Sequence, residues 1–258
     1  MAEAWTVIAA RYGTLETTLG EAYYRWSAYG EPDGPARLDY YFWIVRGDGE
    51  TILVDTGFDP AVGARRGRTC LIEPGAAMER LGVTADSVSR VLLTHLHYDH
   101  TGNLDRFPDA ELLIPAVELD FWMGPMGRRG QFADHVEESD LDVIRAAVEG
   151  GRVRTLVGGE EIADGVHAMH LGGHSPGQMA LAVFGTRPGV ILASDAVHFY
   201  DEIERERPFA VIADLAEMYE GYDTLREVAG ADGHIVPGHD PAVMDRYPEV
   251  EDFAVEIR

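Results

Sequence analysis

Cysteine and basic residues are the scarce components of this sequence. Cys70 is the one cysteine in 258 residues, so the chain can form neither an internal disulfide nor a CxxC metal or redox motif. Lysine and arginine together number 21, against 45 aspartate and glutamate residues, which gives a net charge of −24. Such an acidic surface repels phosphate groups, so we expect neither nucleic acid nor an anionic membrane surface as a partner.

Long apolar stretches are also missing. No apolar run approaches the roughly 18–20 residues that span a bilayer, and the first residues, MAEAWTVIAARYG, lack the basic and apolar segments of a secretion signal. Together with the lack of disulfides, this predicts a cytoplasmic protein. A hydrophobic content of 46% allows a substantial core, and neither a repeat nor a low-complexity linker interrupts the chain. Residues 1–258 are therefore expected to form one domain.

Short strands dominate the predicted secondary structure. Apolar, β-branched and aromatic runs predict strands at 6–13, 38–47, 50–57, 89–95, 110–115, 151–157, 165–171, 178–184, 189–195 and 233–240. A Gly-Asp-Gly turn at 47–49 is expected to close a hairpin. Helical spacing and capping residues predict helices at 74–82, 140–151 and 213–229. Residues 116–137 are interpreted as an irregular insertion over a site, and the whole order suits two sheets with helices outside.

The stretch Thr94–Asn103, THLHYDHTGN, concentrates side chains that can bind metals. His95, His97, Asp99 and His100 follow directly after a predicted buried strand. On a strand His95 and His97 would face the same way, and in a loop all four side chains can converge. Neutral imidazoles with a carboxylate suit zinc, iron or manganese. The spacing therefore predicts a metal site rather than a polar loop with coincidental histidines.

Further candidate ligands follow other predicted strands. His174 lies in the glycine-rich turn LGGHSPGQ, Asp195 lies in LASDAVHF and His239 lies in VPGHD. Taken alone, His174 is explained as a turn residue and Asp195 as a helix cap. Because polar residues at the ends of buried strands gather at functional sites, the three together are predicted to join the histidine motif.

These motifs together resemble a known family. THLHYDH, GHSPG, an aspartate after a strand and PGH, preceded by TILVDTG, resemble the metallo-β-lactamase superfamily from about Leu38 to His239. The resemblance implies an α/β fold: an αββα sandwich of two mixed sheets flanked by helices, with a metal site at the shared edge of the sheets. Asp55 in TILVDTG would orient the loop without binding metal.

The resemblance also implies a two-metal site, since all seven matching positions are filled. The implied ligands of the first ion are His95, His97 and His174. The implied ligands of the second ion are Asp99, His100 and His239. Asp195 would bridge the two ions. The ions are expected to be zinc, with iron or manganese as alternatives.

The chemistry expected of such a site is hydrolysis of a small molecule. Two divalent ions share a hydroxide and lower its pKa towards ~7, which makes it a nucleophile at neutral pH. One ion polarises the substrate carbonyl, and Asp99 is expected to shuttle a proton to the leaving group. No serine or cysteine nucleophile is needed, so Cys70 is interpreted as a buried or half-buried bystander.

Sequence features outside the ligand motifs indicate which subgroup of the superfamily the chain resembles. Common β-lactamases have a cysteine where this sequence has Asp195. The segment after His239 is expected to be too short for the helical domain of glyoxalase II-type thioesterases. The acidic net charge argues against the RNA-processing members of the superfamily. LDYYFWIVRGDGETILVDTGF, HLHYDHTGN and GGHSPGQ resemble the N-acyl homoserine lactonases, which act in quorum quenching, with pyridoxolactonase-like enzymes nearby. This implies that the protein opens lactone rings. His198 stands where those lactonases have a substrate-contacting tyrosine, with Tyr200 two residues further on. His198 is expected either to donate the same hydrogen bond in catalysis or to indicate a different substrate; the alternative is a surface or supporting histidine without substrate contact.

Other interpretations stay open. The site could hydrolyse another cyclic ester, an amide or a thioester in secondary metabolism. It could also serve iron-dependent redox chemistry. A binding protein without activity is disfavoured, because all seven ligand positions are filled. Aromatic residues at 23–26 and 120–127 are expected beside the pocket, in a homodimer interface or in ordinary core packing. The histidines without a motif partner, interpreted as structural or surface residues, are His135, His167, His170 and His234.

Overall fold

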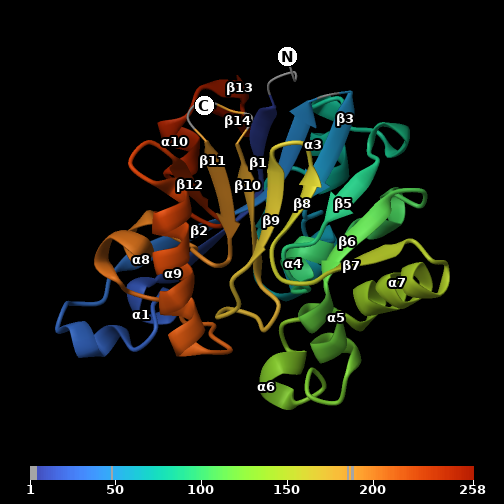
Figure 1. Cartoon of the computed structure of the whole chain (residues 1–258). Helices are drawn as coiled ribbons and strands as arrows, with labels where there is room; N and C mark the ends of the chain where they lie inside the picture. Colours follow the sequence, from blue (N-terminus) through green and yellow to red (C-terminus); the bar gives the residue numbers. More distant parts are fainter. Residues whose placement is uncertain (1–4, 48, 185, 187–188) are drawn as a thin grey trace.

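Two β-sheets packed face to face form the centre of the molecule, and helices cover the outer face of each sheet (Figure 1). The computed structural model describes residues 5–47, 49–184, 186 and 189–258. Both sheets are mixed, since each contains parallel and antiparallel strand pairs. The architecture is the αββα sandwich of the α/β class that the sequence predicts.

The large sheet contains nine strands among the described residues. In chain order they are β1 (Thr6–Thr18), β2 (Pro35–Gly47), β3 (Glu50–Val54), β4 (Thr69–Cys70), β5 (Arg90–Leu92), β6 (Glu111–Pro115), β7 (Val153–Leu156), β13 (Glu249–Glu251) and β14 (Ala254–Ile257). Their spatial order is β13-β14-β1-β2-β3-β5-β6-β7, and β4 pairs with β1. The pairs from β3 to β7 are parallel and the others are antiparallel.

The small sheet contains five strands in the described part of the chain. They are β8 (Glu160–Ala163), β9 (Val166–His170), β10 (Met179–Val183), β11 (Val190–Ser194) and β12 (His234–Pro237). Their spatial order is β12-β11-β10-β9-β8; β11 and β12 are parallel, and the remaining pairs are antiparallel. As a result, β9, β11 and β12 all end at the same edge of the sheet.

The helices are short, apart from two on the outer faces. They are α1 (Leu19–Ala22), α2 (Pro60–Arg65), α3 (Pro74–Arg80), α4 (Tyr98–Thr101), α5 (Ala116–Met123), α6 (Gly130–Ala133), α7 (Glu138–Glu149), α8 (Tyr200–Arg205), α9 (Leu215–Ala229) and α10 (Val243–Arg246). The 3-10 helices are η1 (Trp26–Tyr29), η2 (Ala85–Ser87) and η3 (Leu104–Arg106). Figure 1 shows α8 and α9 beside the small sheet and α7 on the opposite side of the molecule.

Three apolar layers hold the sandwich together. Between the sheets, Trp43 and Leu92 of the large sheet belong to one buried cluster with Leu181 of the small sheet. On the outer face of the large sheet, residues of α3 and α7 such as Ile144 join a second cluster. On the outer face of the small sheet, α9 contributes Tyr222 to a third. Because both faces of each sheet are covered, strands such as β10 and β11 are buried along their whole length.

Each predicted strand is present, with shifted ends. β1 and β2 extend beyond the predicted ranges because they remain paired as far as Thr18 and Pro35. The predicted hairpin is also present, since Gly47 pairs with Glu50 across β2 and β3, although Asp48 in its turn lies outside the described residues. The sequence does not reveal β4, β8, β13 or β14, because strands of two to four residues show too few alternations to be recognised.

The interpretation of residues 116–137 as an irregular insertion is wrong for much of its length. Residues Ala116–Met123 form α5, and Gly130–Ala133 form α6. The apolar residues of α5 are spread around the helix instead of following one face, because the helix has neighbours on several sides, and this hides the helical period.

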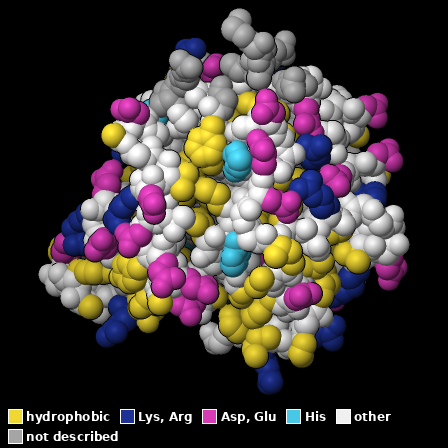
Figure 2. All heavy atoms as spheres, viewed as in Figure 1, with side chains coloured by type: hydrophobic (Ala, Val, Ile, Leu, Met, Phe, Trp, Pro, Cys, Tyr) yellow, Lys and Arg dark blue, Asp and Glu magenta, His cyan; other side chains and the backbone are white. Residues whose placement is uncertain are grey.

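The surface carries the acidic residues that the composition predicts. Figure 2 shows acidic side chains distributed over one face and hydrophobic side chains gathered over α5 and α6. Met126 and Val117, in this region, are each about half exposed. No helix in the described ranges is both long enough and apolar enough to cross a membrane. A homodimer and the division into one domain both stay predictions.

Candidate metal centre

The seven predicted ligands converge at one edge of the sandwich. The loop after β5 carries His95, His97, Asp99 and His100, and the loop from β9 to β10 carries His174. Asp195 directly follows β11, and His239 follows the parallel strand β12. The backbone N–H of Met179 donates to the carbonyl of Thr94 at 2.9 Å, which joins the two sheets at this edge. The convergence follows from strand direction, as the carboxyl ends of neighbouring strands meet at one edge.

The first group consists of His95, His97 and His174. One ring nitrogen of each lies within 4.8 Å of the others, and all three residues are buried. His97 Nδ1 is 3.0 Å from His174 Nε2. Burial, with neighbouring imidazoles, lowers the pKa of each of these histidines well below its usual value. The rings are therefore neutral, which is the form that binds a metal ion.

The second group consists of Asp99, His100 and His239, whose ligand atoms also lie within 4.8 Å of one another. Asp195 lies between the groups. Its Oδ1 is 3.3 Å from His100 Nε2, and its Oδ2 is 3.1 Å from His239 Nε2 and 3.5 Å from His174 Nε2. Burial raises the pKa of Asp195, but the surrounding imidazoles hold it well below its usual value, so it is a carboxylate. A carboxylate in this position can contact two ions at once.

Two buried nitrogens in the cluster have no hydrogen-bond partner. His95 Nε2 and His100 Nε2 are both shielded from solvent and accept or donate no hydrogen bond among the described residues. An unpaired buried polar atom is costly. A bound cation would remove that cost, so these two atoms indicate that the donor set is built for metal ions.

In two of the histidines, a backbone carbonyl fixes Nδ1, the ring nitrogen that points away from Asp195. His174 Nδ1 lies 2.9 Å from the carbonyl of Val211, and His239 Nδ1 lies 2.9 Å from the carbonyl of Asp39. A carbonyl can only accept, so each Nδ1 donates and each Nε2 is directed at Asp195, at 3.5 Å for His174 and 3.1 Å for His239. In the neutral ring that binds a metal ion, this leaves Nε2 as the ligand atom.

Asp55 has the orienting contacts that the sequence predicts for it. Its carboxylate accepts hydrogen bonds from the backbone N–H and the hydroxyl of Thr94, both at 2.8 Å, and lies 2.8 Å from His100 Nδ1. Asp55 adopts the left-handed conformation, with φ of 60°. A non-glycine residue tolerates this strain where contacts fix it. Asp55 therefore connects β3 to the histidine motif without facing the cluster interior.

Glu118, which the sequence does not single out, holds two of the ligand loops together. Its buried carboxyl accepts from Leu96 N–H at 2.9 Å and from Gly177 N–H at 2.8 Å, one on each loop. Ser175 Oγ and Trp122 Nε1 donate to the same carboxyl at 2.6 Å. A single glutamate on a short helix has no motif, so only its placement amid an apolar segment could have indicated that it is buried and paired.

His198 lies beside the cluster, as expected from its position three residues after Asp195. It is buried, and its Nε2 is 3.1 Å from Asp195 Oδ2. Its ring stacks on Phe209 with centroids 3.7 Å apart, and its Nδ1 is 3.4 Å from a carboxyl oxygen of Glu202. Burial lowers the pKa of His198, but Asp195 and Glu202 together raise it to about 9.

Tyr200 and two aromatic residues of the segment 23–26 lie away from the proposed metal ligands. The ring of Tyr200 packs in the core between the sheets, under the guanidinium of Arg246. Tyr23 and Trp26 are buried in a cluster with Phe199. Core packing, one of the alternatives for residues 23–26, therefore holds for these two rings, which cover the segment behind His198.

The cluster opens into a cavity of about 370 Å³. Five of the proposed ligands line this cavity: His97, Asp99, His174, Asp195 and His239. The wall also includes His198, Phe209, Tyr40, Tyr98 and Arg68. An adjoining cavity of about 360 Å³ shares His97, His135 and His174 with it and is lined by Trp122 and Phe132. The expectation that 120–127 contributes to the pocket is thus confirmed for Trp122.

His135 is a site residue that sequence analysis assigned to structure or surface. Its ring lies 4.9 Å from the ring of His97, and it lines both cavities. Its carbonyl accepts from the N–H of Tyr98 at 2.9 Å. It belongs to no motif, since a segment far from the other ligands in sequence brings it there. His170 is exposed, in agreement with the prediction.

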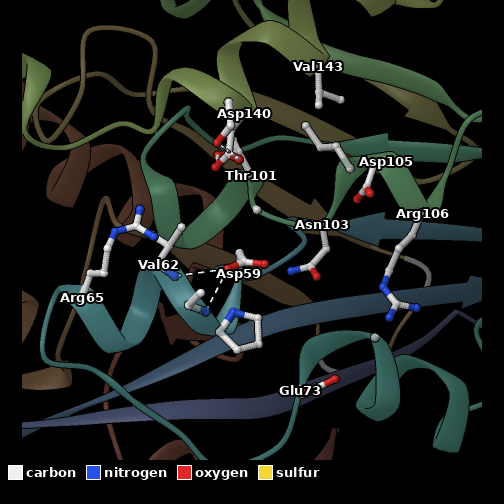
Figure 3. Close-up of a pocket in the computed structure, with 16 residues that line it drawn as sticks. Asp59, Val62, Arg65, Glu73, Thr101, Asn103, Asp105, Arg106, Asp140 and Val143 are labelled. Atoms are coloured by element: carbon white, nitrogen blue, oxygen red, sulfur yellow. Dashed lines mark hydrogen bonds between the residues drawn. The ribbon is translucent and has the colours of Figure 1, made fainter.

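A larger cavity of about 710 Å³ lies behind the motif and contains no histidine (Figure 3). Asp59 caps α2 there, accepting from the N–H groups of Ala61 and Val62 at 2.8 and 3.1 Å. Asp140 accepts from Thr101 Oγ1 at 3.1 Å, which connects α7 to the end of α4. This cavity is thus a polar junction between helices, separate from the predicted ligands.

Comparison with known proteins agrees with this geometry. Residues 37–248 match the family described as the Metallo-beta-lactamase superfamily. N-acyl homoserine lactonase AiiB of Agrobacterium fabrum is 31% identical over 175 residues, 60% of this chain and 62% of that protein. An N-acyl homoserine lactonase of a Bacillus species is 27% identical over 134 residues, 52% of this chain and 48% of that protein. The chain thus matches less than two thirds of the length of these curated relatives.

Solved structures show the same fold over nearly the whole chain. A quorum-quenching N-acyl homoserine lactone lactonase has a TM-score of 0.76 at 19% identity, covering 96% of this chain and 97% of that one. AidC, a dizinc quorum-quenching lactonase, has a TM-score of 0.72 at 15% identity, covering 98% and 94%. With the family match across most of its length, the chain belongs to the metallo-β-lactamase superfamily.

Proposed function

We propose that this protein is a dinuclear metallohydrolase that opens lactone rings, with N-acyl homoserine lactones as the first substrates to test. The observation that carries the proposal is the convergence of seven ligand-type side chains around two buried, unpartnered imidazole nitrogens at the base of a cavity. The names of the related lactonases support the choice of a lactone as substrate.

The donor set fits two divalent ions. His95, His97 and His174 would hold one ion and Asp99, His100 and His239 the other, with Asp195 shared between them. Imidazole nitrogens and carboxylate oxygens without a thiolate suit zinc, and they also suit iron and manganese. When bound, such ions polarise a carbonyl and supply a nucleophile from water at neutral pH.

The side chains around the cluster would position the substrate and move one proton. His198 Nε2 faces the cavity beside Asp195 and would donate a hydrogen bond to the carbonyl oxygen of the lactone, taking the place of the expected tyrosine. Asp99 also lines the cavity, where its carboxylate would carry a proton to the departing ring oxygen. The reaction adds one water: the bond between the acyl carbon and ring oxygen breaks, an alcohol and a carboxylate form, and one proton is released.

Proton release from a long-chain N-acyl homoserine lactone tests the proposal. The metal-loaded protein is compared with protein stripped of metal, and elemental analysis counts the ions in each. We expect rapid acid production that depends on two ions per chain. A sample that holds two ions per chain and leaves the lactone intact would reject a homoserine lactone as substrate; a panel of other cyclic esters, amides and thioesters would then identify the bond.

Elemental analysis also separates hydrolysis from redox chemistry. Seven ligand positions favour two ions, whereas the iron-dependent alternative requires one redox-active ion. Zinc-loaded protein with full activity would support hydrolysis, since zinc has no redox chemistry. Activity that requires a single iron ion and consumes oxygen would contradict the proposal.

A further inference from the structure

Arg68 differs from the neighbouring arginines because it has no anionic partner. It lies just after α2 and lines the same cavity as the proposed metal ligands. Arg66 also lines this cavity, but two of its nitrogens donate to Glu137 at 2.8 and 2.9 Å. Arg65 binds the other oxygen of the same carboxylate at 2.9 Å. Among the described residues, Arg68 forms no ion pair at all.

Neutral groups hold the guanidinium of Arg68 in place. Its Nε donates to the hydroxyl of Tyr98 at 2.8 Å, and Nη1 donates to the carbonyl of Arg66. Its backbone N–H donates to Gly63 at 2.8 Å, and the next residue begins β4. The side chain is therefore fixed by neutral groups, while no carboxylate of the described residues lies within ion-pair distance of its guanidinium.

The surroundings of Arg68 suit an anion. Tyr40 and Tyr98 border the same wall, and burial raises the pKa of each phenol, so both stay neutral. Arg68 is half-buried, and a partly desolvated cation gains most from an opposite charge. A guanidinium matches the two oxygens of a carboxylate. A wall built only for an acyl chain would not need this cation.

We propose that Arg68 binds a carboxylate that the substrate carries away from its lactone ring, so that the preferred substrates are lactones with an anionic side group. The inference rests on the proposed function, because it assumes that the ring itself binds at the metal ligands. Glu16, Glu21 and Asp134 also line the cavity, and their repulsion restricts an anionic group to the wall formed by Arg68.

A matched pair of substrates tests this assignment. N-glutaryl and N-pentanoyl homoserine lactone share the ring and the amide and differ in a terminal carboxylate. We expect wild-type kcat/KM to favour the glutaryl compound by about tenfold, and Arg68→Gln to bring that ratio close to one. Arg68→Lys should keep part of the preference, since it keeps the charge but loses the planar fork.

Arg66→Gln is the matched control. It removes a cation from the same wall that is already paired with Glu137, so the ratio between the two lactones should persist. An equal loss on both lactones in Arg68→Gln would show that Arg68 only supports Tyr98 and would overturn the inference. A ratio near one in the wild type would overturn it as well.

Binding of non-hydrolysable lactams separates this inference from the proposed function. In these analogues a ring N–H replaces the ring oxygen, and calorimetry on the metal-loaded protein measures their affinity without turnover. If neither lactone is opened but the glutaryl lactam binds about tenfold more tightly, and only with Arg68 present, the lactonase proposal fails and the carboxylate site stands. Equal or absent binding of both lactams would reject the site.

Discussion

Two buried glutamates, Glu118 and Glu202, serve different halves of the site with similar hydrogen bonding. Glu118 lies on α5 and accepts from backbone N–H groups of both the His95–His97 loop and the His174 loop. Glu202 lies on α8 and accepts from the N–H groups of His198 and Phe199 at 2.7 and 2.9 Å. The first joins loops from opposite sheets, whereas the second, which also accepts from Phe209 N–H at 3.1 Å, joins segments on the small-sheet side only.

The difference separates metal binding from substrate binding. Glu118 fixes the two ligand loops relative to each other. Replacing it should therefore lower the metal affinity before it affects substrate binding. Glu202 fixes the backbone of His198 and also accepts from the Tyr222 hydroxyl at 2.8 Å. Replacing Glu202 should leave the metal ligands in place and displace His198, which is proposed to contact the substrate. Four changes test this division, starting from the largest expected effect.

Glu118→Gln should weaken metal binding most. Both carboxyl oxygens accept from backbone N–H groups, so the amide nitrogen of glutamine would face such a donor in either orientation. We expect metal affinity to fall roughly 10–100-fold and the free energy of unfolding to fall by about 2–4 kcal/mol. Chelator competition measures the first, and urea unfolding of metal-stripped protein measures the second. Unchanged chelator competition would mean that Glu118 does not position the ligand loops.

Glu202→Gln should lower turnover while retaining metal. We expect metal affinity within about threefold of wild type and a fall in kcat/KM of about tenfold, because a displaced hydrogen-bond donor loses roughly this much transition-state stabilisation. Tyr222→Phe is the control, since it removes one donor from Glu202 and leaves the bonds to His198 and Phe199. Metal loss as severe as in the Glu118 variant would break the comparison.

Asp140 is a half-buried carboxyl that accepts fewer hydrogen bonds than Glu118 or Glu202. Thr101 Oγ1 donates to it at 3.1 Å, and burial raises its pKa to about 6 from 3.8. Because the folded state favours the protonated acid, its contribution to stability is complete below about pH 4 and is lost as the pH rises through 6. Between pH 4 and 7 wild type should lose about 2 kcal/mol relative to Asp140→Asn, allowing for partial exposure. Urea unfolding of metal-stripped protein at several pH values measures this; parallel curves would contradict it.

Gly221→Ala should have the smallest effect, of opposite sign. The added Cβ would meet only Leu171 Cβ, at 3.7 Å, which is ordinary contact within α9. Alanine in a helix interior should stabilise the protein by roughly 0.5–1 kcal/mol without changing metal affinity. Gly177→Ala gives the contrast, since its Cβ would lie 2.4 Å from Glu118 Cβ and should disturb the ligand loop. Thermal unfolding distinguishes the two, and equal shifts would contradict the expectation.

The sequence predicts the metal ligands but not the residues that hold their loops in position. His95, His97, Asp99 and His100 can be predicted because ligand-type residues rarely fall so close together, and their strand context indicates where they lie. Glu118 and Glu202 cannot be predicted, since each lies on a short helix outside any motif and only the fold supplies its donors. His135 is missed for the same reason.

The fold shows a similar division between strong and weak signals. The buried runs of β2 and β11 are continuous and apolar, so they can be recognised without the structure. β13 and β14 are too short to stand out, and the spread of apolar residues around α5 hides its helical period. Tertiary contacts, rather than local preference, decide these elements.

The pairing of β1 with β14 has a consequence for how the chain folds. Val7 lies opposite Ile257 in the second and third strands from one edge of the large sheet, so residues from the two ends of the described chain are neighbours. The sheet stays unfinished, with β1 exposing an unpaired edge, until β14 has been synthesised and has docked. Contacts of such long sequence separation form slowly, and an open edge of this kind invites pairing between chains. Slow refolding, with yield that falls as protein concentration rises, is the behaviour expected of this connectivity.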